Sequence, residues 1–266
     1  MTSFILRRRK KDVIKELPEK LENNIFIDLS DEQKKLYVSE LENVREKMNE
    51  LLVSGGVSKV RFMILQLLMK LRQICIDPSI VYEDYNGGSN KIDTLINVVL
   101  ESISNNHKIL IFTSFKTALN IVKKRLDKEN IKSFIIDGSV KSKDRVDRVD
   151  DFNNSTTPCV FLIMLKSGGT GLNLTSADVV IHLDLWWNPQ AENQATDRAH
   201  RIGQKNTVEV IKLITRGTIE EKILVLQDKK RKLSDKIIDG TDRCENIISS
   251  LTEKDIRNLL SYENKD

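Results

Sequence analysis

Cysteine and histidine are scarce in this chain of 266 residues, which contains three of each. Cys75, Cys159 and Cys244 lie far apart, no pair of them has the spacing of metal ligands, and no histidine clusters with them. These features exclude a cysteine-based metal centre and a disulfide framework, and we predict no metal site. Three unpaired thiols are typical of a cytosolic or nuclear protein.

Long apolar runs are absent as well. No stretch approaches the ~18 apolar residues of a membrane span, and the run Phe4-Ile5-Leu6 is too short for a signal peptide and is followed at once by RRRKK. We therefore expect no membrane partner. Aromatic residues make up 5% of the chain, so Leu, Ile and Val are expected to form the core, and the 31% of charged residues suits a soluble globular protein.

The net charge of +4 is mildly basic, which permits a nucleic-acid partner without requiring one. Residues 1–20 carry seven basic and three acidic side chains, and this abrupt start on a basic strip indicates a piece of a longer chain. Residues 30–53 and 57–77 are predicted to be helices, because apolar positions recur at helical spacing in the second and Ser30 with Gln33 forms a capping box at the start of the first.

From residue 91 onward, predicted helices alternate with short apolar strands. This order predicts an α/β fold with a mostly parallel sheet and helices on both faces, preceded by the helical segment. Ligands of such sheets lie beyond the carboxyl ends of the strands, and we expect the informative motifs in those loops. The predicted strands are residues 108–115, 133–137, 159–164, 179–184 and 207–215.

A glycine-rich loop, LKSGGTGLNLTSAD (165–178), follows the third predicted strand. Its glycines would let backbone amides approach a phosphate closely, whereas the alternative is a plain tight turn. A Rossmann-like dinucleotide site is a further alternative, but the third glycine of that fingerprint is absent.

A second motif, QATDRAHRIGQ (194–204), places Arg198 and Arg201 three residues apart, on one face of a predicted helix 190–201. Two adjacent guanidiniums repel each other unless an anion lies between them, and a triphosphate would suit them. The alternative is an exposed helix whose arginines pair with Glu192 and Asp197.

The third motif, DLWWNP (184–189), holds both tryptophans of the chain. An indole presented to nucleic acid is one interpretation, and an aromatic plug beneath a loop is the other. The P-loop pattern G-x-x-x-x-G-K-[ST] occurs nowhere in the sequence.

Taken in order, these strings resemble the SWI/SNF-type helicase-like ATPases of superfamily 2, and specifically their C-terminal motor lobe. The resemblance covers nearly the whole chain. The passage out of the first motor lobe is resembled by FILRRRKKDVIKELPEK, and the segments that open the second part are resembled by LSDEQKKLY and LRQICIDPSIV. Motif four is resembled by ILIFTSF, and the box that follows it by DGS (137–139). Motif five is resembled by LKSGGTGLNLTSAD, the tryptophan box by DLWWNP, and motif six by QATDRAHRIGQ.

The resemblance implies a RecA-like lobe that closes over ATP held by another lobe. Arg198 and Arg201 would be the arginine fingers that reach the γ-phosphate, and Gln194 would help to arrange the site. The residues implied to line the nucleotide side are Gly169, Gly171 and Asn173. The residues implied to face DNA are Ser114, Lys116, Gly138, Ser139, Lys166, Thr170 and Trp187. The serine-threonine pair usual before the basic residue of motif five is Met164-Leu165 here, which weakens the DNA-side assignment.

The same resemblance divides the chain into five parts. They are an inter-lobe connector (1–29), a helical protrusion with a flexible link (30–90), the RecA-like helicase C-terminal lobe (91–215), a brace helix (216–240) and a polar tail (241–266).

The expected function is that of the second lobe of a DNA-dependent ATPase or translocase, which remodels or displaces DNA-bound protein. ATP and Mg²⁺ would be held mainly by the first lobe, so this chain alone is expected to be inactive. The expected partners are double-stranded DNA and the N-terminal motor lobe, and the chain is expected to be a monomer. It would be cytoplasmic and nucleoid-associated in a bacterium, or nuclear in a eukaryote. A stand-alone DNA-binding or regulatory module is the alternative, supported by the basic residues of 7–11 and 222–236.

Overall fold

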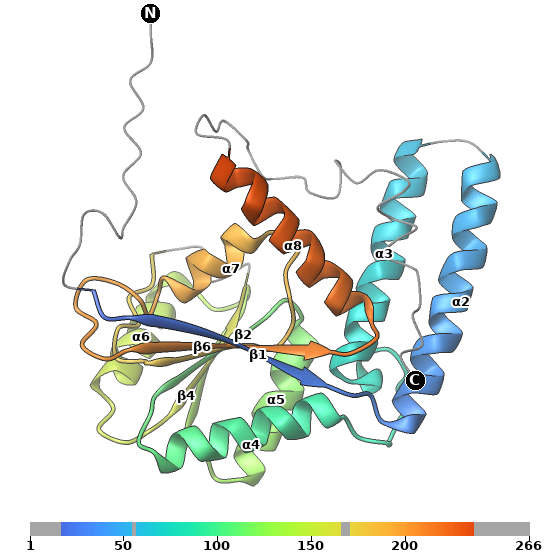
Figure 1. Ribbon diagram of the computed structural model, residues 1–266. Helices are drawn as coiled ribbons and strands as arrows, with labels where there is room; N and C mark the ends of the chain where they lie inside the picture. Colours follow the sequence, from blue (N-terminus) through green and yellow to red (C-terminus); the bar gives the residue numbers. More distant parts are fainter. Residues whose placement is uncertain (1–16, 55–56, 166–170, 237–266) are drawn as a thin grey trace, which may run out of the picture.

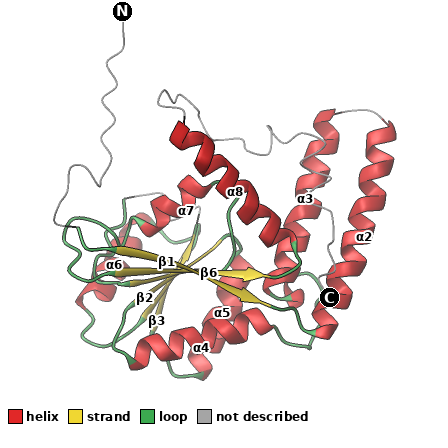
Figure 2. Ribbon diagram, viewed as in Figure 1, coloured by secondary structure: helices red, strands yellow, loops and turns green. Residues whose placement is uncertain are grey.

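The computed structural model of the protein describes residues 17–54, 57–165 and 171–236. Within these residues one six-stranded, all-parallel sheet has the strand order β1-β6-β5-β2-β4-β3. Figure 2 shows the strands gathered in one sheet with helices around it. The strands are β1 (Lys20–Ile27), β2 (Ile109–Thr113), β3 (Ser133–Ile136), β4 (Val160–Met164), β5 (Val179–His182) and β6 (Val208–Thr215). The predicted α/β class with a parallel sheet is confirmed, and so are the five predicted strands.

Helices cover both faces of the sheet, as the apolar runs of its central strands require. The helices α4 (Asn90–Ser104) and α5 (Lys116–Lys128) cover one face, and α6 (Ser142–Asn154) and α7 (Pro189–Thr196) cover the other (Figure 1). Strand β2 shows the alternation: Ile109 and Ile111 pack with α4 and α5, whereas Leu110 and Phe112 belong to the core beneath α6 and α7.

A helical hairpin lies beside the carboxyl ends of β1 and β6 (Figure 1). It consists of α2 (Asp31–Ser54) and α3 (Val57–Ile76), and it is followed by the 3₁₀ helix η1 (Pro78–Ile80). The predicted helical segment before the lobe is thus confirmed. The hairpin also packs against α8 (Ile219–Lys236), the predicted brace helix, since Tyr37 and Leu71 share a buried cluster with Ile219 and Ile223.

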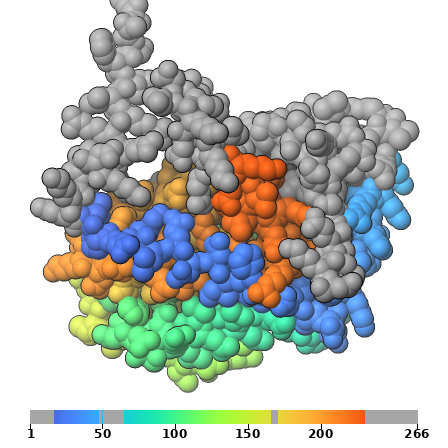
Figure 3. Space-filling model, in the orientation of Figure 1, coloured from blue at the N-terminus to red at the C-terminus, as the bar shows by residue number. Residues whose placement is uncertain are grey.

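Strand β1 was not predicted from the sequence, where its residues fall in the expected connector 1–29. It pairs in parallel with β6 from Lys20 opposite Val208 to Ile27 opposite Thr215, and it forms an edge of the sheet. Most of its residues are exposed, and Figure 3 shows it on the surface. An edge strand is covered on one side only, so its sequence, KLENNIFI, lacks the continuous apolar run by which the other strands were found. The basic strip 7–11 and the tail 241–266 lie outside the described residues.

Candidate functional site

The paired arginines follow α7 instead of lying on it. Helix α7 ends at Thr196, and Arg198 and Arg201 lie in the turns of residues 197–203, the arginine turn. The prediction of one helix over residues 190–201 is therefore wrong in its second half, and the two arginines do not share a helix face. Gln194, from the same motif, is exposed on the last turn and a half of α7.

Gln204 holds the chain in the non-helical arrangement that follows α7. Its side-chain amide donates to the carbonyl oxygens of Ala177 and Ala199, at 2.7 and 3.1 Å. Its Oε1 accepts hydrogen bonds from the backbone amides of Lys205 and Asn206, at 2.8 and 2.9 Å. This one side chain therefore bonds both ends of the segment that follows α7 and fixes the arginine turn to the loop before β5.

The arginine turn lies at the amino end of the sheet. Helix α7 starts beyond the carboxyl end of β5 and returns to the start of β6, so the turn that follows it meets the residues before β1. His200 Nε2 donates to the carbonyl oxygen of Pro18 at 2.8 Å, and the amide of Val208 donates to the carbonyl oxygen of Glu19 at 3.0 Å. The expectation that the motifs gather beyond the carboxyl strand ends is thus wrong for motif six.

The charges of the arginine turn are poorly compensated by the protein. The pKa of Arg198 is lowered, first by burial and then by the positive charge of Arg201, while Asp197 opposes the shift. Arg198 Nε is buried and has no hydrogen-bond partner among the described residues. Glu192, a carboxylate expected to pair with the arginines, instead contacts Lys212 Nζ at 3.1 Å. Two guanidiniums that repel each other are a site that an anion would stabilise.

The glycine loop (165–178) contacts the arginine turn directly. The amide of Leu174, in its described part, donates to the carbonyl oxygen of Arg198 at 3.0 Å. The carbonyl of the exposed Asn173 accepts a hydrogen bond from Asn153 Nδ2 at 2.9 Å. Gly171 has φ 46°, in the left-handed region that favours glycine. Three predicted site residues lie outside the described residues: Lys166, Gly169 and Thr170.

A second group of predicted site residues gathers at the carboxyl ends of β2 and β3. Lys116 Nζ lies 2.7 Å from Asp137 Oδ2, and the amide and hydroxyl of Ser139 donate to Asp137 Oδ1 at 2.9 and 2.5 Å. These bonds hold the pKa of Asp137 well below its usual range, the bond from Lys116 contributing most. Ser114 directly follows β2 and Gly138 lies in the turn after β3, so the structure brings these four predicted DNA-facing residues to one edge.

Trp187 is the exception among the predicted DNA-facing residues. It is only 5% exposed and packs with Leu185, Ile219 and Ile223 in the cluster between the hairpin and α8. This is the arrangement of an aromatic plug, the alternative interpretation of its motif, and it leaves little of the indole available to a DNA strand. Residues 183–188, which carry both tryptophans, form the tryptophan loop.

Sequence reasoning missed Arg72, on α3, which is buried against the tryptophan loop. Its Nη2 donates to Asp184 Oδ2 and to the carbonyl oxygen of Leu185, both at 2.6 Å. The signal in the sequence is a lone arginine on the apolar face of a predicted helix, in LRQICIDPSIV. Its partners follow more than a hundred residues later, so the sequence alone could not identify them.

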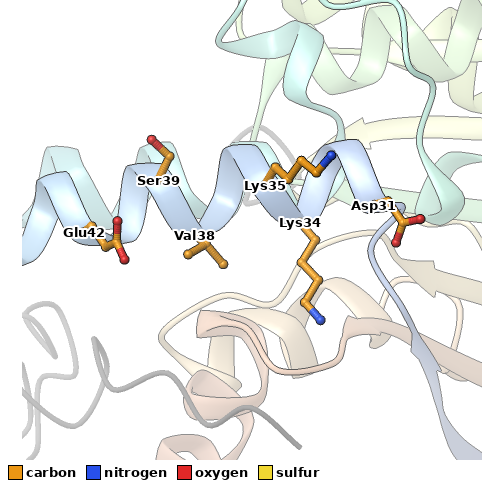
Figure 4. Close-up of a pocket in the computed structure, with 6 residues that line it drawn as sticks. All are labelled: Asp31, Lys34, Lys35, Val38, Ser39 and Glu42. Atoms are coloured by element: carbon orange, nitrogen blue, oxygen red, sulfur yellow. The ribbon is translucent and has the colours of Figure 1, made fainter. Parts of the chain in front are cut away.

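A hollow on the outer side of α2 is separate from these groups (Figure 4). It is lined by Asp31, Lys34, Lys35, Val38, Ser39 and Glu42, which all lie on one helix and include no predicted site residue. Among the described residues no group of three or more His, Cys, Asp or Glu side chains is arranged to hold a metal ion. Nor does any helix in that part of the chain have the length and apolarity to cross a membrane.

Comparison with known proteins identifies two matching domain families. The profile of a "Helicase conserved C-terminal domain" matches residues 90–203, and that of an "SNF2-related domain" matches residues 1–80. A Mycoplasma pneumoniae protein named "Uncharacterized ATP-dependent helicase" is 40% identical over 258 residues, which are 97% of this chain and 24% of that protein. The chain therefore spans about a quarter of the length of that curated relative.

Two solved structures from Sulfolobus solfataricus are also similar. The C-terminal domain of a SWI2/SNF2 ATPase is 32% identical with a TM-score of 0.73, and the match covers 92% of this chain and 100% of that one. The SWI2/SNF2 ATPase core in complex with dsDNA is 35% identical with a TM-score of 0.75, over 98% of this chain and 54% of that one. The chain thus belongs to the SWI/SNF-type helicase-like ATPases of superfamily 2 and corresponds to the C-terminal, RecA-like lobe of their motor.

Proposed function

We propose that this chain is the second motor lobe of a DNA-dependent ATPase that moves on duplex DNA and remodels or displaces proteins bound there. The observation that carries the proposal is the arginine turn. Burial lowers the pKa of Arg198, the positive charge of Arg201 lowers it further, and the buried Nε of Arg198 lacks a partner among the described residues. An anionic ligand would satisfy both features, and the triphosphate of ATP is the ligand that the family uses.

The position of the arginine turn suits a nucleotide that a second lobe delivers. The sequence has no P-loop, so a first lobe would hold ATP and Mg²⁺, and this chain alone is expected not to hydrolyse ATP. The hydrogen bond between His200 and Pro18 places the arginine turn beside the segment through which a preceding lobe would be joined. Closure of the two lobes would then bring Arg198 and Arg201 to the γ-phosphate, where arginine stabilises the charge of the transition state.

The remaining nucleotide-side residues surround the arginine turn in this proposal. Gln194 precedes it on α7, and the hydrogen bond from Leu174 to Arg198 keeps Gly171 and Asn173 near it. Gly169 belongs to the same glycine loop. Because the loop and the arginine turn are joined by this hydrogen bond, a displacement of one would move the other.

The proposed DNA contacts lie at the opposite, carboxyl edge of the sheet. Ser114, Lys116, Gly138 and Ser139 gather there, and Lys166 and Thr170 would extend the surface from the glycine loop. Helix α5 begins at Lys116 without a side-chain cap, so its first amides are available to a phosphate. A contribution of Trp187 would be indirect, through the loop that it anchors. The lobe would act as a monomer, on the nucleoid of a bacterium or in a eukaryotic nucleus.

The test joins this chain to a matching first lobe and measures DNA-stimulated ATP hydrolysis. Arg198→Ala and Arg201→Ala should each lower the turnover number by roughly 10³–10⁵-fold, because the transition-state charge loses a partner. Arg125→Ala is the control, since Arg125 is on α5 and pairs with Asp93 away from both proposed edges. Undiminished turnover in either arginine-turn variant would refute the assigned role, and a loss shared by the control would show that the effect is general.

A further inference from the structure

Arg72 is a buried cation that neither proposed edge includes. Its side chain is 1% exposed and that of its partner Asp184 is fully buried. Beyond Asp184 and Leu185, Arg72 Nη2 donates to the hydroxyl oxygen of Ser114 at 3.2 Å. Asp184 Oδ1 accepts hydrogen bonds from the amide of Ser114, at 2.9 Å, and from Thr113 Oγ1, at 2.6 Å. The pair therefore holds both the backbone and the side chain of Ser114.

This arrangement leaves the Ser114 hydroxyl ready to donate. Its oxygen accepts a hydrogen bond from Arg72, and no described residue accepts one from its O–H. A hydroxyl has one donor hydrogen and two acceptor lone pairs, so Arg72 occupies an acceptor position and the hydrogen stays available for an anion. Ser114 lies at the carboxyl edge beside Lys116, where the phosphate backbone of DNA is proposed to bind.

Aromatic rings enclose the guanidinium of Arg72. The guanidinium carbon lies 5.2 Å from the ring centroid of Phe115, 5.4 Å from that of Trp186 and 5.6 Å from that of Trp187. Aromatic faces attract a cation and lower the cost of burying it. The chain has two tryptophans, and both are in this cage, so a movement of Arg72 changes the surroundings of every indole in the protein.

The other side of the tryptophan loop is bonded to α7 and α8. Glu192, on α7, accepts hydrogen bonds from the Trp186 amide at 2.6 Å and from Gln227 Nε2 at 2.8 Å. Gln227, on α8, also donates to the Trp186 carbonyl oxygen. Helix α7 leads directly into the arginine turn. Contacts therefore continue without a gap from Ser114 through Arg72 and the tryptophan loop to the helix that precedes Arg198.

We infer that Arg72 is a positioning residue that couples a DNA phosphate bound at Ser114 to the tryptophan loop and, through that loop, to α7. The inference rests on the proposed function, because it requires DNA at the carboxyl edge. A phosphate beside Ser114 adds negative charge on one side of the guanidinium. This charge draws Arg72 toward the edge and weakens its bonds to Asp184 and Leu185, so the loop that these bonds hold is shifted.

The experiment uses the 266-residue chain and a duplex of mixed sequence. Binding is followed by the anisotropy of a labelled duplex over a range of salt concentrations, and coupling is followed by tryptophan emission with an unlabelled duplex. The variant is Arg72→Lys, which keeps a cation but loses the planar fork. The matched control is Lys91→Arg, in the Lys91–Glu220 pair, whose side chains are as buried as those of Arg72 and Asp184 (1% and 0%).

In the parent chain, saturation with duplex should change the tryptophan emission. Arg72→Lys should lose this change, whereas the slope of log affinity against log salt should stay the same because the variant keeps the positive charge. Lys91→Arg should keep both. Ser114→Ala leaves the buried pair intact and should also lose the emission change, which tests the coupling even if Arg72→Lys does not fold.

Two results would overturn the inference while DNA binding persists. One is an unchanged emission response in Arg72→Lys or in Ser114→Ala, and the other is an equal loss of that response in Lys91→Arg. If the parent chain does not bind duplex at all, the proposed DNA edge is wrong and the coupling falls with it. The anisotropy measurement therefore separates failure of the proposed function from failure of the coupling.

Discussion

The ion pair between Lys91 and Glu220 makes a sharp prediction for the stability of the lobe. Lys91 Nζ lies 2.6 Å from Oε1 and 2.5 Å from Oε2 of Glu220, and both side chains are buried. Without the ammonium, the Glu220 carboxylate would keep one backbone donor, the amide of Thr215 at 2.8 Å. Lys91→Met should therefore lower the free energy of unfolding by about 3–5 kcal/mol, the cost of an uncompensated buried charge.

A compensating substitution separates the charge from the packing. Glu220→Gln in the Lys91→Met background removes the unpaired charge, while its carbonyl oxygen can still accept from the Thr215 amide. The double variant should therefore regain about half or more of the lost free energy, since a neutral amide is far cheaper to bury than a carboxylate. The remaining deficit would come from the amide group, which lacks an acceptor.

Urea unfolding followed by far-ultraviolet circular dichroism measures these differences. A domain of this kind has a total free energy of unfolding of about 5–15 kcal/mol. The predicted loss is therefore most of the lowest value and about a fifth or more of the highest, and it is easily resolved. A loss below about 1 kcal/mol in Lys91→Met would show that the substitution does not leave an uncompensated buried charge at Glu220. A double variant less stable than the single one would likewise refute the charge argument.

Three further predictions concern other parts of the lobe. Gln227→Leu removes a donor from Glu192 and should cost about 1–3 kcal/mol, and an unchanged urea midpoint would contradict this. Burial lowers the pKa of His182 to about 4, so between pH 6.5 and 4 this imidazole is protonated in the unfolded chain but not in the folded one. The free energy of unfolding should therefore fall by about 3 kcal/mol as the pH drops from 6.5 to 4. His182→Asn should lack this pH-dependent loss. A free energy of unfolding that falls equally with pH in the parent and the variant would refute the prediction. Lys116→Ala should change stability by less than about 1 kcal/mol but decrease the salt slope of duplex binding by about 0.9, and an identical slope would exclude a phosphate contact.

The sheet was largely predictable because four of its strands are buried on both sides. Strands such as ILIFT (109–113) and VFLIM (160–164) are continuous apolar runs between turn residues, and such runs identify a strand without knowledge of its neighbours. Strand β1 gives the opposite case. Its polar residues are acceptable because it lies at an edge, but that position depends on its pairing with β6, almost two hundred residues later in the chain.

The site was predictable in its residues but not in its geometry. Motif order identified Arg198 and Arg201, whereas the arginine turn is fixed by a side chain, Gln204, whose bond to Ala177 spans 27 residues. The burial of Trp187 was similarly invisible, because its neighbours come from the hairpin and from α8. In both cases the deciding contacts join segments that are distant in the sequence, and local pattern carries no information about them.

The two proposed edges lie at opposite ends of the sheet, so communication between them needs an element that spans it. Helix α7 has eight residues and is about 12 Å long, which is the distance between the tryptophan loop at its start and the arginine turn at its end. Glu192 fixes this helix laterally through Lys212 and the Trp186 amide. If DNA shifts the tryptophan loop as inferred, α7 would transmit this shift along its axis to Arg198. A lobe of this design would adjust its arginines to bound DNA without any change in the sheet.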